Sequence, residues 1–196
     1  MKIVAVSQRV DLFPDRGERR DALDQRLAAW LSLAGYLAAP VPNRLAGDKA
    51  LLPWLTALRP AALLLSGGND IGDAPERDQT ESQMLDYAES RGIPVLGICR
   101  GMQMLAARAG SPAEPVTGHV RTRHVLTGEL SGEVNSFHNF GFHHCPDGYL
   151  ATAQAEDGSI EAIRHRELPW EGWMWHPERE PDFSSRDLDR LKALFP

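Results

Sequence analysis

The chain has 196 residues, of which 42% are hydrophobic, and a formal net charge of −6 at pH 7. This length suits one well-buried core better than two, so we expect a single domain spanning residues 1–196. The acidic balance argues against a general nucleic-acid-binding protein, because such domains usually carry an excess of basic residues. Two cysteines and no long apolar run give no sign of a disulfide framework or a membrane span, and we expect a cytoplasmic protein.

Residues 1–110 alternate between short apolar runs and segments in which apolar residues recur at helical spacing. The first pattern predicts buried parallel strands and the second predicts the helices that connect them. Strands are expected at 2–7, 37–41, 61–65 and 95–98, and helices at 23–34, 49–58, 76–89 and from 100 to near 110. We expect Gly35 to end the first helix, Asp48 to cap the second, and residues 8–24 to form a charged loop at the rim.

Beyond residue 110 the sequence changes to short alternating runs separated by Gly, Pro, Thr and His. It predicts short strands, partly antiparallel, at 132–136, 149–155, 160–164 and 172–175, and a terminal helix that begins at Asp182 or Ser184. His119 and His124 are expected in a rim loop. The whole pattern predicts an α/β protein with a doubly wound, mostly parallel sheet, helices on both faces and some antiparallel strands in the C-terminal half.

Cys99 lies in Gly97-Ile-Cys99-Arg-Gly101, between a predicted strand and a predicted helix. A residue on such a tight turn brings its neighbours two positions away close together, and glycine at both flanks relieves the clash. The turn also places the thiol at a helix N-terminus, which favours a thiolate. Cys99 is therefore the candidate nucleophile. The alternative is a buried cysteine that ends a core strand.

Reactive groups in a doubly wound sheet gather beyond the carboxyl ends of its strands. The N–H of Arg100, directly after Cys99, would point to where an oxyanion forms. Gly67 and Gly68 follow the strand at 61–65, and the Gly68 N–H could complete a two-donor oxyanion hole. The alternative for Gly67-Gly68-Asn69 is an ordinary tight turn.

His176-Pro-Glu178 follows the last predicted strand. A neutral imidazole can take the thiol proton, and a carboxylate on its far nitrogen fixes the tautomer. A histidine beside a Pro-Glu turn is by itself more often a surface feature, but together with the cysteine turn it predicts a Cys-His-Glu triad. The run 134–138, Val-Asn-Ser-Phe-His, could hold the ends of an amino acid or form a simple strand-end turn.

These motifs, in this order, resemble the class I, triad-type glutamine amidotransferases and within them the γ-glutamyl-peptide hydrolase branch. The resemblance rests on segments 63–70, 97–103, 134–138 and 176–178. It implies a flavodoxin-like sheet, a γ-glutamyl thioester on Cys99, His176 as base and acid, and Glu178 as the group that orients it. The residues it assigns to the glutamyl substrate are Gly67, Asn69, Gln103, Asn135, Ser136, Phe137 and His138.

The sequence departs from this pattern at two positions. Ala106 stands where the family has Asn, and the Asn-Ser-x-His-His-Gln pattern of the γ-aminobutyrate branch here ends in His138-Asn139-Phe140. The runs 7–10, 135–140 and 157–162 instead resemble the γ-glutamyl-CDP-amidate hydrolases of bacterial capsule phosphoramidate synthesis. That resemblance implies cytidine diphosphoramidate and glutamate as products.

The charged segment that follows the first strand contains Arg9, Arg16, Arg19 and Arg20. Because guanidinium groups suit a pyrophosphate, we predict that one or more of them, with Arg9 and Arg16 as the candidates, contact a phosphate of a nucleotide-linked leaving group. The alternative is a solvated loop in which neighbouring carboxylates balance the arginines.

No metal or cofactor is expected, because the adjacent residues His143, His144 and Cys145 are poorly placed to share one ion. The expected partner is a small γ-glutamyl substrate, with a homodimer or a separate synthetase left open. The leading hypothesis is a stand-alone γ-glutamyl amide hydrolase. The alternatives are a glutaminase component that passes ammonia to a synthetase, a γ-glutamyl-γ-aminobutyrate-type hydrolase, and a non-catalytic protein on the same scaffold.

Overall fold

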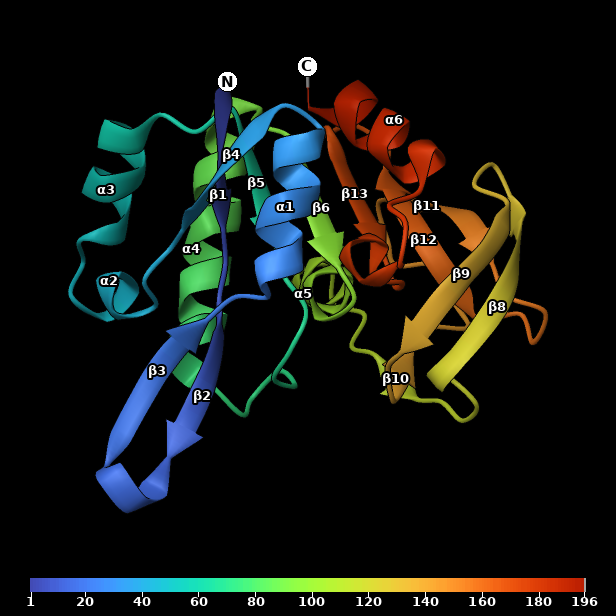
Figure 1. Ribbon diagram of the computed structural model, residues 1–196, viewed down its shortest axis with the longest axis horizontal. Coiled ribbons are helices and arrows are strands. Elements are labelled where there is room, and N and C mark those ends of the chain that lie inside the picture. The colour runs from blue at the N-terminus through green and yellow to red at the C-terminus, as the bar shows by residue number, and fades with distance from the viewer. Residues whose placement is uncertain (196) are drawn as a thin grey trace.

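The structure is a computed structural model that describes residues 1–195, in which the chain builds a nine-stranded sheet (Figure 1). Five neighbouring strands are parallel, in the order β4 (Tyr36–Pro40), β1 (Lys2–Val6), β5 (Ala62–Leu65), β6 (Val95–Ile98) and β13 (Trp170–Trp173). Four antiparallel strands extend the sheet, in the order β12 (Ile160–His165), β11 (Tyr149–Gln154), β8 (Val120–Gly128) and β9 (Gly132–Phe137). The predicted α/β class, with antiparallel strands in the C-terminal half, is confirmed.

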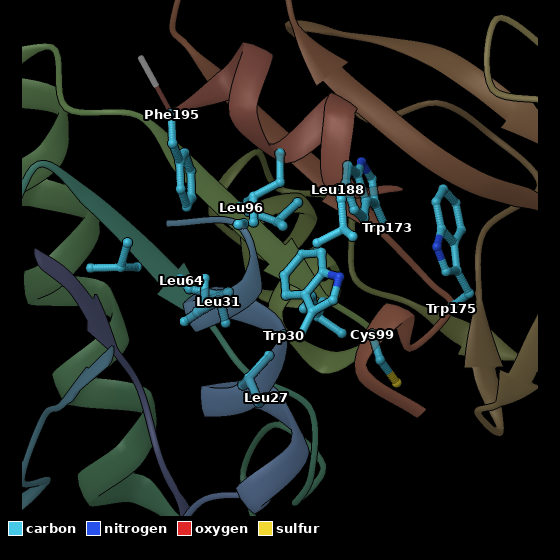
Figure 2. Packing of buried hydrophobic residues seen from close by; sticks show 14 of the residues in the cluster. Leu27, Trp30, Leu31, Leu64, Leu96, Cys99, Trp173, Trp175, Leu188 and Phe195 are labelled. Atoms are coloured by element: carbon cyan, nitrogen blue, oxygen red, sulfur yellow. The ribbon is translucent and has the colours of Figure 1, made fainter. Parts of the chain in front are cut away.

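Helices cover both faces of the sheet, because successive strand residues point to opposite sides. Val4 and Val6 pack in one cluster with α1 (Gln25–Leu33) and α6 (Ser185–Leu194). Ala5 faces the other cluster, with α3 (Leu51–Leu58), α4 (Pro75–Arg91) and α5 (Arg100–Arg108). Figure 2 shows the first cluster, where Trp30 of α1 meets Trp173 of β13 edge to face and Cys99 lies at the margin. No helix within residues 1–195 is long and apolar enough to cross a membrane.

The predicted loop at 8–24 is instead a hairpin of β2 (Arg9–Phe13) and β3 (Glu18–Ala22), joined by the short 3-10 turn η1 (Pro14–Arg16). The hairpin projects beyond the sheet (Figure 1). Most of its side chains are at least partly exposed, so its strands lack the apolar alternation by which a half-buried strand is recognised. Its pairing comes from backbone hydrogen bonds, which the sequence pattern does not display.

Three local predictions need correction. Asp48 does not cap α3; it ends the short helix α2 (Arg44–Gly47), and α3 begins after Ala50 without a side-chain cap. The segment 120–128, expected as a loop around His124, is the nine-residue strand β8, which pairs with β9. The last strand, β13, begins two residues earlier than predicted and runs parallel to β6. The remaining small strands are β7 (Glu114–Pro115) and β10 (Phe140–Gly141), which pair with each other.

The turn between β6 and α5 has no room for side chains at its flanks, as the sequence predicted. A Cβ atom on Gly97 would lie 2.5 Å from the backbone carbon of Gly101, and one on Gly101 would lie 2.2 Å from the Leu65 carbonyl oxygen. Both contacts are with backbone, which a rotamer change does not relieve. The two glycines thus let the first turn of α5 pack directly against β6 and against the end of β5.

We expect Gly101→Ala to lower the free energy of unfolding by about 3 kcal/mol, because the added methyl group overpacks this contact. Gly47→Ala is the matched control: its Cβ meets nothing within 4 Å and it lies in a helix, so it should be neutral or slightly stabilising. Urea unfolding of the two variants checks this. Equal stabilities for the two variants would contradict the packing argument.

Candidate active site

Cys99 occupies the strained turn that the sequence predicted. Its backbone has φ 52° and ψ −106°, a conformation that residues with a side chain seldom adopt, and it directly precedes α5. The Cys99 N–H donates to the Trp173 carbonyl at 2.6 Å, and its carbonyl accepts from the Gln103 N–H at 3.1 Å. Strain of this kind persists only where surrounding contacts enforce it. Here β13 on one side and the first turn of α5 on the other fix the position of the sulfur.

His176 and Glu178 form a buried pair just beyond β13. The imidazole Nδ1 lies 2.7 Å from Glu178 Oε1, and both side chains are almost fully buried. Asn135 of β9 makes two hydrogen bonds to the backbone of His176. Its Nδ2 donates to the His176 carbonyl, and its Oδ1 accepts from the His176 N–H. Because Nδ1 carries the proton shared with Glu178, Nε2 is the nitrogen left for a reacting group. Gly67 makes room for the ring, since a Cβ there would lie 2.5 Å from His176 Cε1.

The pKa of His176 reflects opposing effects. Burial disfavours the charged ring, but hydrogen bonding to Cys99 and to Glu178, with the charges of both groups, outweighs it and raises the pKa to about 9. The imidazole therefore holds its proton at neutral pH. With Nδ1 hydrogen-bonded to Glu178, the proton on Nε2 is the one that the ring can deliver to a leaving group.

Two cavities meet at His176. The smaller, of about 140 Å³, is lined by Cys99, Arg100 and Gln103 together with Phe137 and His138. The larger, of about 290 Å³, is bounded by the β2–β3 hairpin and α1 and includes Arg9. Gly68, His176 and Arg179 line both cavities. A ligand that filled both would therefore contact Gly68, His176 and Arg179.

A buried ionic network supports the candidate oxyanion turn. Arg77 of α4 donates from Nε to Glu81 at 3.0 Å and from Nη2 to the Ser66 carbonyl at 2.5 Å, and Arg100 pairs with Glu81 and Asp78. Burial lowers the pKa of Arg77 to about 10 and that of Arg100 to about 9, which leaves both charged at neutral pH. The Arg100 side chain is thus bound away from the cavity, and its backbone N–H is what it can offer to a ligand there.

The sequence-predicted substrate residues separate into two groups. Gly68, Gln103, Phe137 and His138 line the smaller cavity with Cys99, whereas Gly67 lines the larger one. The polar atoms of Asn69, Asn135 and Ser136 are bound within the protein.

For Asn69, Asn135 and Ser136 the structure indicates a positioning role in place of substrate contact. Asn69 holds both the N–H and the carbonyl of Val10, which anchors the hairpin, and Ser136 donates to the His119 carbonyl. Arg9 lines the larger cavity and pairs with Asp11 at 2.7 Å. Arg16 lies at the hairpin tip, exposed, and lines neither cavity.

Several residues of the site were not singled out from the sequence. Arg77 and Glu81 are completely buried, and their spacing of four residues on a predicted helix is the one signal that could have indicated a pair. Arg179 lines both cavities and lies over the Phe137 ring at 5.1 Å. Its place directly after Glu178 gave no comparable signal.

Comparisons with known proteins agree with this geometry. The sequence profile of the family "Glutamine amidotransferase class-I" matches residues 38–188. The γ-glutamyl-CDP-amidate hydrolase of Campylobacter jejuni is 36% identical over 140 residues, covering 68% of this chain and 69% of the relative. A glutamine-hydrolysing GMP synthase subunit of Methanothrix thermoacetophila is 33% identical over 129 residues, covering 61% of this chain and 71% of that relative.

The fold is also found among solved structures. A crystal structure of a putative GMP synthase subunit from Thermoplasma acidophilum superposes with a TM-score of 0.71 at 19% sequence identity, covering 99% of this chain and 94% of that one. At this identity the likeness concerns the fold alone.

The His176–Glu178 pair generates a pH prediction. A raised pKa means that the charged imidazole stabilises the folded state fully below its ordinary pKa of about 6.5 and loses this contribution as the pH rises through about 9. Glu178→Gln removes one of the groups that raise this pKa, so it should lower the pKa of His176 and shrink the loss of stability over that range.

Titration of His176 by NMR, with urea unfolding at both ends of the range, measures both effects. Glu156→Gln, at an exposed position, is the control that should change neither. An unchanged His176 pKa in Glu178→Gln would show that the carboxylate does not hold the proton.

Proposed function

Because the chain belongs to the class I glutamine amidotransferase family, we propose that it hydrolyses a γ-glutamyl amide through a thioester on Cys99, with γ-glutamyl-CDP-amidate as substrate. The observation that carries the reaction type is the pairing of Cys99, on its strained turn, with a His176 imidazole whose proton is held by Glu178. The name of the Campylobacter jejuni relative supports this choice of substrate.

In the proposed reaction the Cys99 sulfur attacks the γ-carbonyl carbon while its proton resides on His176. The N–H groups of Arg100 and Gly68 stabilise the oxyanion, and the network around Arg77 and Glu81 keeps these two donors in place. His176 then protonates the leaving nitrogen, the C–N bond breaks, and the glutamyl group stays on sulfur as a thioester. Water that gives its proton to His176 attacks the thioester, releasing glutamate and restoring the thiol.

The two cavities suit the two parts of this substrate. The glutamyl part fits the smaller cavity, where Gln103 and His138 line the wall beside Cys99. The nucleotide-linked leaving group fits the larger one, which carries the guanidinium groups of Arg9 and Arg179 at its edge. Guanidinium groups bind phosphate oxygens in pairs of parallel hydrogen bonds, so these two arginines are the candidates for pyrophosphate contact.

A second candidate function is that of a glutaminase component that passes ammonia to a synthetase. The similarity to a glutamine-hydrolysing GMP synthase subunit favours it, and the same triad would serve it equally well. The two functions differ in whether hydrolysis needs a partner protein and in whether glutamine is a good substrate.

We expect wild-type protein to release glutamate from γ-glutamyl-CDP-amidate much faster than from glutamine or γ-glutamyl-γ-aminobutyrate. Cys99→Ala should lower kcat/KM at least about 10³-fold, because no other nucleophile remains in the cavity. Glutamate release from the three compounds, measured for both proteins, checks this. Fast turnover of glutamine, or glutaminase activity that rises on adding a synthetase, would favour the second function, and an active Cys99→Ala would refute the nucleophile assignment.

We further expect Arg9→Ala to lower kcat/KM for the nucleotide-linked substrate about 10-fold or more, the usual effect of losing a charge-assisted hydrogen bond. The same variant should leave the turnover of a simple γ-glutamyl amide unchanged. Arg16→Ala is the matched control, since it removes the same charge from the same hairpin but from outside the cavity. Steady-state kinetics on both substrates decide it, and equal losses for both substrates in Arg9→Ala would contradict the assignment.

A further inference from the structure

A second group of ionisable side chains lies apart from the Cys99–His176–Glu178 triad, where residues of β8 and β12 come together. His119 directly precedes β8, His124 lies within it, and Glu161 lies in β12. One ligand atom from each lies within 4.8 Å of the other two. His119 is 1% exposed and Glu161 is completely buried, so water does not solvate the centre of this group.

The sequence did not indicate this group because the two histidines are five residues apart, which in a regular strand places them on opposite faces. The structure brings them together through a β-bulge. Arg121 has a positive φ of 56° and is the extra residue between Val120, which pairs with Phe137, and Thr122, which pairs with Ser136. One inserted residue shifts the alternation by one position, so both imidazoles turn toward Glu161.

The hydrogen bonds of this group are incomplete. Neither carboxylate oxygen of Glu161 accepts a hydrogen bond, and Nδ1 of His119 and Nε2 of His124 make none. The polar groups that face Glu161 Oε1 are the rings of His119 and His138, and a buried carboxylate is almost always paired or bound to a metal. The ligand atoms of His119, His124 and Glu161, which lie within 4.8 Å of one another, therefore form a site that a cation would complete.

His119 and His138 each have one ring nitrogen against an oxygen outside the group, at Asp157 and at the Phe140 carbonyl, and the other ring nitrogen facing Glu161. When Nε2 of His119, which lies 2.9 Å from Asp157 Oδ2, carries the only proton of the ring, Nδ1 presents a lone pair toward Glu161 Oε1 at 3.3 Å. Nδ1 of His138 lies 2.9 Å from the Phe140 carbonyl, which can only accept, and its Nε2 lies 3.4 Å from the same Glu161 oxygen. Protonating both rings would satisfy this oxygen but would leave His124 Nε2 and Glu161 Oε2 without partners.

We propose that His119 Nδ1, His124 Nε2 and a Glu161 oxygen bind one divalent transition-metal ion of the zinc type. Imidazole and carboxylate are ligands that zinc accepts, and ligand atoms of a tetrahedral zinc ion lie about 3.3 Å apart. The distance of 3.3 Å between His119 and Glu161 fits that geometry. Asp157 on the far nitrogen of His119 forms the carboxylate–histidine pair that commonly orients a metal-binding imidazole.

The ion has a structural role in this proposal. It ties the β8–β9 hairpin to β12, and through Glu161 it fixes His138, which lines the cavity that holds Cys99. The proposal does not depend on which amide the triad hydrolyses.

Zinc binding by chelator-stripped protein tests it, measured in competition with a chromophoric chelator. We expect one Zn²⁺ per chain, an affinity lower by at least about 100-fold in His124→Gln and Glu161→Gln, and by about 10-fold or more in Asp157→Asn. Co²⁺ should give the visible absorption of a site with nitrogen and oxygen ligands and no thiolate charge-transfer band. His124 and Asp157 are partly exposed, so these two variants decide the question if Glu161→Gln fails to fold.

Two controls separate this site from other metal ligands of the chain. Cys99→Ala removes the triad thiol, and His143→Ala with His144→Ala removes an exposed histidine pair. All of these should bind Zn²⁺ like the wild type. The proposal is wrong if stripped wild-type protein binds no Zn²⁺, if His124→Gln binds it unchanged, or if binding is lost in a control variant instead.

Discussion

The contact between the first turn of α5 and the end of β5 is the constraint on which the rest of the candidate site depends. Gly101 lies against the Leu65 carbonyl with no space for a side chain, and Cys99, two residues earlier, has a positive φ of 52°. The Cys99 N–H is then held by the Trp173 carbonyl of β13. Because β13 leads to His176, this hydrogen bond places Cys99 beside the strand that carries the histidine.

The buried charges of α4 and α5 serve the same arrangement. Arg77, Glu81 and Arg100 are removed from water, and a buried ion pair seldom stabilises a fold more than apolar residues of the same size would. Their hydrogen bonds to Ser66 and Ser7 instead fix the segment that follows β5. The main effect of this network is therefore to order the turn at Gly67 and Gly68, and its contribution to the stability of the fold is small.

The antiparallel half of the sheet holds the imidazole. Asn135 of β9 makes two hydrogen bonds to the backbone of His176, so the β8–β9 hairpin helps to position the His176 imidazole. The group of His119, His124 and Glu161 lies between this hairpin and β12. The two halves of the sheet thus contribute differently to the candidate site: Cys99 follows the parallel strand β6, and the antiparallel strand β9 holds the backbone of His176.

Apolar spacing and paired glycines are local signals, so the parallel strands, the helices that cross between them and the turn at Cys99 could all be predicted from the amino-acid sequence. The order of Cys99, His176 and Glu178 along the chain likewise indicated a triad. The β2–β3 hairpin, the pairing of Arg77 with Arg100 through Glu81, and the internal hydrogen bonds of Asn69 and Asn135 could not be predicted in this way. Each of these joins residues far apart in the chain or strands with both faces exposed, and the bulge at Arg121 changes which side chains share a face. Spacing along the chain records none of these contacts, because they exist only once distant segments have packed together.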